Sequence, residues 1–357
     1  MAAHLIDLND VTVAQWNSIL KLAHDIKEAP MVYAGSCRGK IMGTLFFEPS
    51  TRTQMSFQTA MLRLGGGIIG FDNPSNSSVA KGENLKDTTK IVSGYADLLV
   101  MRHPSEGASK AAALTADCPV INAGDGGHLH PTQTLTDLLT LREEKGRLDG
   151  LTVGFCGDLK NGRTVHSLLK ALSCYPDNHF LLISTEALRL PAYIKDYISA
   201  SGKTYEEFSS LEEALPKLDV LYMTRIQQER FASVEEYQAQ KHVFCLDAEK
   251  MKLARKDLIV LHPLPRVDEI AVEVDDDPRA LYFKQANYGV YVRMALILSI
   301  LDYHLQSKPL LRGEVVRGMT CTNPKCICRT EKYLPHSFRR AGDVLECEYC
   351  DERLLMQ

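Results

Sequence analysis

Residues 46–57, FFEPSTRTQMSF, place three hydroxyls and an arginine where an apolar run ends and a helical pattern begins. The hydroxyls belong to Ser50, Thr51 and Thr53, and the arginine is Arg52. Ligands of open α/β sheets bind beyond the carboxyl ends of strands, where a helix N-terminus favours phosphate. The alternative is ordinary capping by Ser50 or Thr51 with Arg52 on the surface, but capping explains a single hydroxyl. The pattern therefore favours an anion site.

Three later segments also place cations or amides at the ends of apolar runs. VMRHP contains Arg102, HLHPTQTLTDL contains His130 and Gln133 at a helix start, and GDLKNGRTVHS contains Arg163 in a glycine-flanked loop. A single arginine or histidine in such a place is usually structural or solvated. Together they supply several cations and a titratable histidine. Neither a Walker pattern nor GxGxxG occurs in these segments, which gives nucleotide binding little support.

Further loops could contribute contacts to a ligand. NSSVAKGENLKDT places Ser77 and Lys81 in a polar loop, and YMTRIQQER places Arg225 and Gln227 after an apolar run. A solvated charge is the ordinary interpretation of such a lysine, and a surface ion pair that of such an arginine. LHPLPRVDEI encloses Leu264 between two prolines, which predicts a stiff loop able to present carbonyl groups to a ligand.

The elements that must position these residues alternate between short apolar runs and helical patterns. The first series has strands predicted at 41–47, 96–102 and 119–123, with helices at 54–64, around 109–116, and at 132–141. The second has strands predicted at 151–157, 179–184, 219–224, 243–247 and 258–265, and an apolar helix at 291–305. Such alternation predicts an α/β fold class with two α/β domains, each built on a mainly parallel sheet and linked by helices.

The pattern also predicts where the domains divide. The first domain is expected at residues 1–150 and the second at 151–306, with a last helix at about 288–306 that packs back on the first. A linker is expected at 307–319 and a small C-terminal zinc-binding β domain at 320–357.

Composition excludes several classes of function. The 357 residues carry a formal net charge of -4, so no basic excess points to nucleic acid or to a membrane surface. The first residues lack the pattern of a signal peptide, and no apolar run approaches a membrane span. We therefore expect a soluble intracellular protein without nucleic-acid or membrane partners.

The ten cysteines fall into two groups. Five are scattered along the first 245 residues and predict buried thiols in a reducing compartment. The others crowd into the tail, where Cys321-x4-Cys326 and Cys347-x2-Cys350 form the two close pairs typical of a zinc site. The tail has few large apolar residues, so zinc would supply its folding energy. The alternative is a set of free or redox-active thiols, and Cys328 is a surplus cysteine that could displace Cys326.

Seven of these segments, in this order, make residues 5–306 resemble the catalytic chain of aspartate carbamoyltransferase: FFEPSTRT, KGENLKDT, MRHP, HPTQTLTDL, GDLKNGRTVHS, YMTRIQQER and HPLPRVDEI. Ornithine carbamoyltransferase typically has HCLP where this chain has HPLP, and two arginines suit a dicarboxylate better than a cation. The resemblance implies carbamoyl transfer from carbamoyl phosphate to L-aspartate, giving N-carbamoyl-L-aspartate and phosphate. This reaction is the committed step of de novo pyrimidine biosynthesis.

The resemblance also implies a role for each candidate residue. Residues 1–150 would bind carbamoyl phosphate and 151–306 aspartate. Thr53, Arg102 and His130 would hydrogen-bond the carbonyl oxygen as negative charge builds on it, and Lys81 would join them in catalysis. The full implied set of substrate contacts is Ser50, Thr51, Arg52, Thr53, Ser77, Lys81, Arg102, His130, Gln133, Arg163, Arg225, Gln227, Leu264 and Pro265. In relatives a neighbouring subunit supplies the residues matching Ser77 and Lys81, which implies a homotrimer.

The tail resembles the zinc domain of the aspartate carbamoyltransferase regulatory chain. This resemblance implies a structural Zn²⁺ held by Cys321, Cys326, Cys347 and Cys350, with no metal or other cofactor in catalysis. The nucleotide-binding domain that precedes it in that chain has no counterpart in this sequence, so we expect neither strong nucleotide control nor a required separate regulatory chain. We expect a cytoplasmic enzyme. The alternative is a catalytically inactive carbamoyltransferase-like scaffold that carries a zinc-ribbon interaction module.

Overall fold

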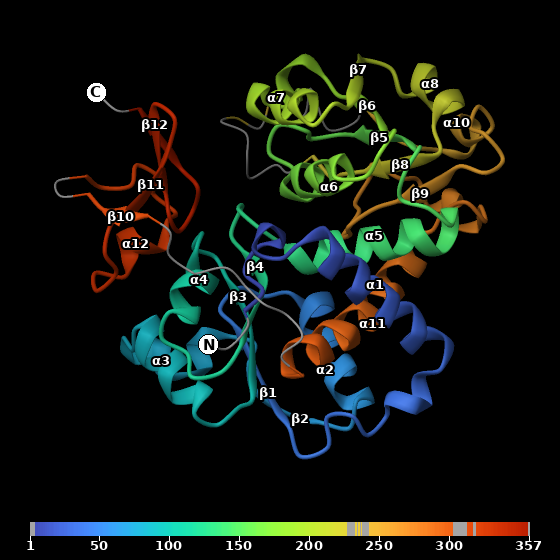
Figure 1. Ribbon diagram of the computed structural model, residues 1–357. Helices are drawn as coiled ribbons and strands as arrows, with labels where there is room; N and C mark the ends of the chain where they lie inside the picture. Colours follow the sequence, from blue (N-terminus) through green and yellow to red (C-terminus); the bar gives the residue numbers. More distant parts are fainter. Residues whose placement is uncertain are drawn as a thin grey trace. The chain divides into compact units, whose positions relative to one another are not determined.

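A computed structural model describes residues 4–226, 233, 235, 237, 243–302, 313–316 and 319–355. The chain forms two compact units (Figure 1). The first comprises Met1–Thr132 and Val290–Gln357, and the second Gln133–Gly289. Two helices, α5 (Pro131–Lys145) and α11 (Tyr282–Leu301), cross the boundaries between these sequence ranges.

The body of the first unit is a four-stranded parallel sheet in the order β2-β1-β3-β4. Its strands are β1 (Ile41–Phe46), β2 (Gly67–Phe71), β3 (Leu98–His103) and β4 (Val120–Asp125). Its helices are α1 (Val13–Glu28), α2 (Thr51–Arg63), α3 (Leu85–Ser93) and α4 (Ala108–Ala113). The first four residues of β3 and all six of β4 are buried, as expected of parallel strands covered on both faces.

The second unit repeats this design with a five-stranded parallel sheet in the order β7-β6-β5-β8-β9. Its strands are β5 (Thr152–Cys156), β6 (His179–Ile183), β7 (Thr204–Phe208), β8 (Val220–Met223) and β9 (Ile259–Leu261). Its further α-helices are α6 (Arg163–Ser173), α7 (Ala192–Ala200), α8 (Leu211–Ala214) and α10 (Ala248–Met251). Short 3-10 helices in the two units are η1 (Leu8–Asp10), η2 (Pro30–Tyr33), η3 (Pro74–Asn76), η4 (Ser78–Lys81), η5 (Glu186–Leu188), η6 (Leu215–Lys217) and η8 (Val272–Asp276).

The tail, red in Figure 1, belongs to the first unit and forms a small antiparallel sheet. Its elements are β10 (Glu314–Val315), α12 (Ile327–Thr330), β11 (Ser337–Ala341), β12 (Val344–Cys347) and β13 (Arg353–Leu355). Gly342 has φ 64° in the turn between β11 and β12, a conformation that glycine adopts without strain. The tail sheet thus starts at β10, inside the range predicted as a linker. Two α/β units with a small β tail confirm the predicted fold class.

The sequence pattern did not predict two of the strands. β2 (GIIGF) and β7 (TYEEF) each lie at one edge of their sheet, half-exposed, with glycines or glutamates in place of a continuous apolar run. Conversely, the strand predicted at 243–247 contributes an isolated bridge between Leu246 and Ile270. Helix α11 begins at Tyr282, well before the predicted start at 288–291. A search of the described helices found none with the length and apolar character needed to cross a bilayer.

Candidate functional site

The hydroxyl-rich segment follows β1 directly and lies beside Arg102. Phe46 pairs with Arg102 across β1 and β3, and the Phe47 amide donates a hydrogen bond of 2.8 Å to the Arg102 carbonyl. Ser50 is the N-cap residue of α2, but its side chain makes no capping bond. Thr53 is buried within the first turn. The parallel pairing therefore brings the start of α2 and the end of β3 to the same edge of the sheet.

Two cations lie close together at this edge. Desolvation, followed by the neighbouring charge of Arg102, lowers the pKa of Arg52. Arg102 forms an ion pair of 2.8 Å with Glu48, while its buried Nε has no hydrogen-bond partner among the described residues. Like charges held together are stabilised by an anion, so the arrangement suits a phosphate or a developing oxyanion.

Gly124 allows Arg102 and His130 to approach the same point of the backbone. A Cβ atom on Gly124 would lie 2.7 Å from Nη1 of Arg102 and 3.5 Å from Cδ2 of His130, and the residue has φ 121°. His130 is buried, with its Nδ1 3.4 Å from the hydroxyl of Thr132. The structure thus brings Arg102, at the end of β3, and His130, on the segment after β4, close to the same point of the backbone.

The loop that carries Ser77 and Lys81 lies between β2 and α3. The Ser77 hydroxyl donates to the Pro74 carbonyl at 2.8 Å and accepts from the Val79 amide at 3.3 Å. Lys81 is exposed at the last position of η4, before Gly82 in the left-handed region. The hydroxyl of Ser77 therefore maintains the loop, while the ammonium of Lys81 extends into solvent.

In the second unit, Arg163 and Arg225 follow adjacent parallel strands. Arg163 is the first residue of α6 after β5, and Arg225 lies two residues after β8. A Cβ on Gly157 would lie 2.4 Å from the Thr224 carbonyl oxygen, so the two strand ends approach closely at a glycine with φ 118°. Both arginines are partly exposed. Gln227 lies outside the described residues.

A buried hydrogen-bond network joins Gln133 to the loop after β9. Asp137 accepts bonds of 2.7 Å from the side-chain amides of Gln133 and Gln285, and a bond of 3.0 Å from the hydroxyl of Tyr222. Gln285 in turn accepts from the backbone amide of His262 at 2.9 Å. Asp137 therefore fixes the side-chain amide of Gln133, a predicted substrate residue. Through Gln285 it also fixes the start of the loop after β9, which contains the predicted substrate residues Leu264 and Pro265.

That second loop contains Leu264, whose φ of 55° is uncommon for a branched residue. Its amide donates to Nδ1 of His262 at 2.7 Å, and Nε2 of His262 lies 2.7 Å from Glu269. Burial would raise the pKa of Glu269, but its hydrogen bond to His262 leaves the pKa lowered. The hydrogen bond between His262 and Glu269 thus holds the loop from within. The adjoining Pro265 is exposed.

Sequence reasoning missed these supporting residues. Asp137 lies one helical turn after Gln133, a spacing at which side chains meet, so the contact could have been found. Gln285 and His262 lie far from Asp137 in the sequence, and only the folded second unit brings them together.

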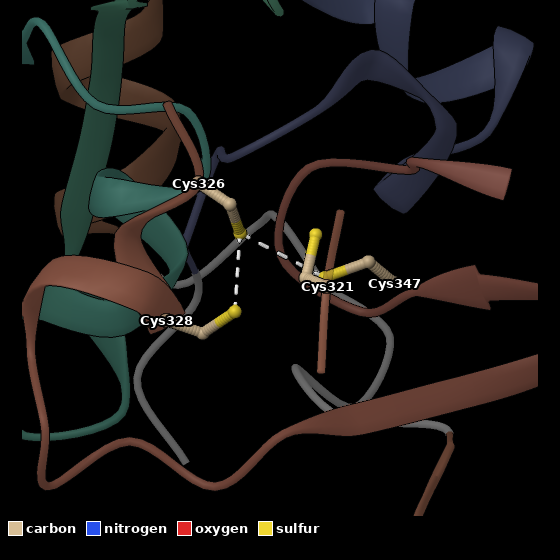
Figure 2. Close-up of side chains that lie close together, drawn as sticks. All are labelled: Cys321, Cys326, Cys328 and Cys347. Carbon is tan, nitrogen blue, oxygen red and sulfur yellow. Dashed lines mark hydrogen bonds between the residues drawn. The ribbon is translucent and has the colours of Figure 1, made fainter. Parts of the chain in front are cut away.

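Five buried thiols gather in the tail. The Sγ atoms of Cys321, Cys326, Cys328 and Cys347 all lie within 4.8 Å of one another (Figure 2). The separations from Cys326 are 3.3 Å to Cys328 and 3.8 Å to Cys347, and Sγ of Cys350 lies 3.6 Å from Cys321.

These separations fit a tetrahedral zinc ion. Bonds of about 2.3 Å to four sulfurs place neighbouring sulfurs roughly 3.8 Å apart. Hydrogen bonds with Cys326 and then Cys328 lower the pKa of the Cys321 thiol to about 4, and hydrogen bonds among the thiols lower the pKa of Cys347 but raise those of Cys326, Cys328 and Cys350. Several buried thiolates side by side repel one another unless a cation neutralises them. The donor set therefore suits a metal ion that prefers sulfur.

The tail attaches to the segment that directly follows β3. The backbone amide of Glu106 donates to the Lys325 carbonyl, and the Ile327 amide donates to the Glu106 carbonyl, both at 2.9 Å. The Asn323 amide donates to the Glu106 carboxylate at 2.6 Å. A Cβ on Gly107 would lie 2.5 Å from the Tyr349 carbonyl oxygen, so this backbone approach requires glycine. The tail is thus hydrogen-bonded to residues that lie a few positions after Arg102.

Two ion pairs complete the attachment. Lys110 lies 2.8 Å from the fully buried carboxylate of Glu348. His128 bridges the body and the tail, with Nδ1 3.1 Å from Asp125 and Nε2 3.0 Å from Asp351. Burial would lower the pKa of His128, but the charges and hydrogen bonds of Asp125 and Asp351 raise it well above its usual value. His128 is therefore a cation held between two carboxylates.

Comparison with protein families assigns all three parts of the chain. Residues 3–143 match the aspartate/ornithine carbamoyltransferase carbamoyl-P binding domain, and residues 149–300 match the Asp/Orn binding domain of the same family. Residues 314–356 match the metal binding domain of the aspartate carbamoyltransferase regulatory chain.

Individual relatives agree. The aspartate carbamoyltransferase catalytic subunit of a Clostridium perfringens strain is 59% identical over 299 residues, which are 84% of this chain and 97% of the relative. That of Clostridium kluyveri is 55% identical over 298 residues, again 84% and 97%. The catalytic subunit of M. jannaschii aspartate transcarbamoylase superposes with a TM-score of 0.80 at 46% identity, covering 84% of this chain and 98% of that one. The Trypanosoma cruzi enzyme in complex with N-(phosphonacetyl)-L-aspartic acid has a TM-score of 0.78 at 40% identity, covering 84% and 95%.

The Asp137 network yields a first prediction. Asp137→Ala removes the acceptor of three donors from the interior, so the free energy of unfolding should fall by about 3 kcal/mol. Urea unfolding followed by circular dichroism measures this change. Asp196→Ala, which removes an exposed carboxylate from α7, is the matched control and should leave the midpoint unchanged. Equal midpoints for the two variants would contradict the network's structural role.

The His128 bridge yields a second, pH-dependent prediction. A histidine whose pKa is raised in the folded protein contributes stability fully below its unfolded pKa, about 6.5, and loses it as pH rises through the folded pKa. The melting temperature of the wild type should therefore fall more steeply above pH 6.5 than that of His128→Gln. His179→Gln, which alters a partly exposed histidine of β6, should follow the wild type. Parallel curves for wild type and His128→Gln would rule out a charged bridge.

Proposed function

The chain belongs to the aspartate/ornithine carbamoyltransferase family, and we propose that it transfers the carbamoyl group of carbamoyl phosphate to the amine of L-aspartate. The products are N-carbamoyl-L-aspartate and phosphate, and we assign the reaction to pyrimidine biosynthesis. The observation that carries the proposal is the pair of arginines, Arg52 and Arg102, beside the Ser50–Thr53 hydroxyls at the ends of β1 and β3. This donor set fits the dianionic phosphate of the first substrate.

In the proposed mechanism the chain positions its substrates and stabilises charge. Arg52 and the residues at the start of α2 bind the phosphate, where the helix N-terminus adds its dipole. Thr53, Arg102 and His130 donate to the carbamoyl oxygen as the aspartate amine attacks the carbon, because negative charge then develops on that oxygen. Lys81 and Ser77 add contacts to the phosphate. The tetrahedral species collapses, and the departing phosphate takes the amine proton.

Recognition of aspartate is assigned to the second unit. Arg163 and Arg225 bind the two carboxylates, because a guanidinium fork matches a carboxylate with two hydrogen bonds. Gln227, Leu264 and Pro265 complete this group, with the Leu264 backbone carbonyl facing the amine. Gln133 contacts the carbamoyl group, held by its bond to Asp137.

We assign the thiol cluster to one structural zinc ion, held by Cys321, Cys326 and Cys347 with Cys350 as the fourth ligand. Bound zinc supplies folding energy to the tail. Four thiolates fill a tetrahedral ion and leave no position for substrate, so the carbamoyl transfer is assigned to the protein's own side chains. The supporting observation is the buried sulfur set, in which Sγ of Cys326 lies 3.8 Å from that of Cys347 and Sγ of Cys350 lies 3.6 Å from that of Cys321.

The assembly and location follow from the same assignment. We propose a cytoplasmic homotrimer in which Ser77 and Lys81 of one chain act in the site of its neighbour, without a separate regulatory chain. The exposed position of Lys81 at the end of η4 supports this, because the ammonium is available to another subunit.

Release of phosphate from carbamoyl phosphate tests the activity. A coupled phosphate assay should show turnover with L-aspartate and none above background with ornithine. Turnover with ornithine alone would transfer the chain to the other branch of the family, and inactivity with both amines would favour an inactive scaffold.

A third prediction concerns Arg52. Arg52→Ala removes a charged contact to phosphate in the transition state, which should lower kcat/KM at least about a hundredfold. Circular dichroism should show an unchanged fold. Arg38→Ala, an exposed arginine elsewhere in the first unit, is the control and should retain full activity. Near-normal turnover by folded Arg52→Ala would refute the phosphate assignment.

A fourth prediction tests the shared site. Lys81→Ala and Arg52→Ala chains, each inactive alone, should regain activity when mixed under conditions of subunit exchange, because some mixed trimers contain an intact site. Exchange is verified by native mass spectrometry with one chain isotopically labelled. Absence of recovery after verified exchange would place Lys81 in its own chain's site or outside the site altogether.

A further inference from the structure

The tail holds more thiols than a tetrahedral zinc ion can bind. All five cysteines of the cluster are buried, so none of them is set apart by exposure to solvent. Cys321, Cys326 and Cys347 belong both to the set of four whose Sγ atoms lie within 4.8 Å of one another and to the set of four expected from the sequence. Cys328 and Cys350 are therefore the two candidates for the fourth ligand, and a different structural feature supports each of them.

Cys328 is supported as a ligand by its closeness to the three shared ligands. Its Sγ lies 3.3 Å from that of Cys326 and within 4.8 Å of those of Cys321 and Cys347 (Figure 2). It belongs to α12, whose first residue, Ile327, donates its amide to the Glu106 carbonyl at 2.9 Å. Cys328 is thus held by a helix fixed to the body of the first unit.

Cys350 is supported as a ligand by the tight turn that places it near Cys347. The Asp351 amide donates to the Cys347 carbonyl at 3.0 Å, and Asp351 has φ 59°, which folds residues 347–351 into a compact turn. Sγ of Cys350 lies 3.6 Å from Cys321. This turn is fixed to the body by different contacts, those of Glu348 with Lys110 and of Asp351 with His128.

We propose that Cys328 and Cys350 are interchangeable fourth ligands, so that zinc is held by Cys321, Cys326, Cys347 and either of the two. The inference rests on the zinc site proposed above and adds an alternative ligand to it. With zinc bound, an exchange would replace one Zn–S bond by another, and the incoming thiol would lose a proton while the departing thiolate gained one. The net charge of the site and the oxidation state of every atom stay the same.

The exchange is possible because Cys328 and Cys350 lie on segments that are attached to the body of the first unit by different contacts. Loss of the Cys350 side chain leaves α12 docked on Glu106, and loss of the Cys328 side chain leaves the 347–351 turn docked on Lys110 and His128. Either change therefore leaves one candidate thiol in place: Cys328, close to all three shared ligands, or Cys350, 3.6 Å from Cys321. A site with only four cysteines has no such reserve, because loss of one leaves three.

The test compares metal content in full-length proteins: wild type, Cys328→Ser, Cys350→Ser, the double variant and Cys347→Ser. Zinc per chain is measured by mass spectrometry after gel filtration in the presence of a chelator. Cys174→Ser, which removes an exposed thiol outside the tail, is the matched control. Cobalt substitution provides a second readout, because sulfur-to-cobalt charge-transfer absorption grows with the number of bound thiolates.

We expect about one zinc per chain in wild type, in both single variants and in the control, with little or none in the double variant and Cys347→Ser. Both cobalt-loaded single variants should keep the four-thiolate absorption of the wild type. Loss of zinc from either single variant would make that cysteine obligatory and overturn interchangeability, as would retention by the double variant. A metal-free wild type would instead contradict the zinc site itself, whatever the variants do.

Discussion

The parallel pairing of β1 with β3 is the constraint on which the candidate site depends. It places the N-terminus of α2 next to Arg102, and so holds two guanidinium groups near each other in a partly desolvated place. Such an arrangement costs free energy in the empty protein, since each charge raises the cost of the other. In the function proposed above, a dianionic substrate would offset that cost, so the fold itself would provide part of the driving force for binding phosphate and for stabilising a developing oxyanion.

The tail depends on the same strand ends. Glu106 follows β3 closely, and His128 lies in the connection from β4 to α5, two residues before His130. The contacts of Glu106, Lys110 and His128 with the tail therefore also limit the movement of the segments that carry Arg102 and His130. Buried pairs such as Lys110–Glu348 contribute little net stability but penalise any misplaced docking, because a separated charge would remain buried without its partner.

The sequence predicted the parts of the fold that have strong local patterns. The buried β1, β3, β4 and β5 and the helices after β1 and β4 could be recognised because burial on both faces demands continuous apolar runs. The edge strands β2 and β7 could not, since these two strands are half-exposed and tolerate Gly67, Gly70 and the glutamates of β7. The candidate substrate residues were found through short motifs. The contact of Asp137 with Gln285, and that of Gln285 with His262, arise only from tertiary folding, and spacing alone left Cys328 as a surplus cysteine.

The central claim is that the start of α2, with Arg102 and His130, binds carbamoyl phosphate. A crystal structure with carbamoyl phosphate and succinate, which is aspartate without its amine, tests it most directly. The account predicts the phosphate within hydrogen-bond distance of Arg52 and the Ser50–Thr53 segment, with the carbamoyl oxygen facing Arg102 and His130. Phosphate bound at any other place, with these side chains in contact with solvent alone, would contradict it.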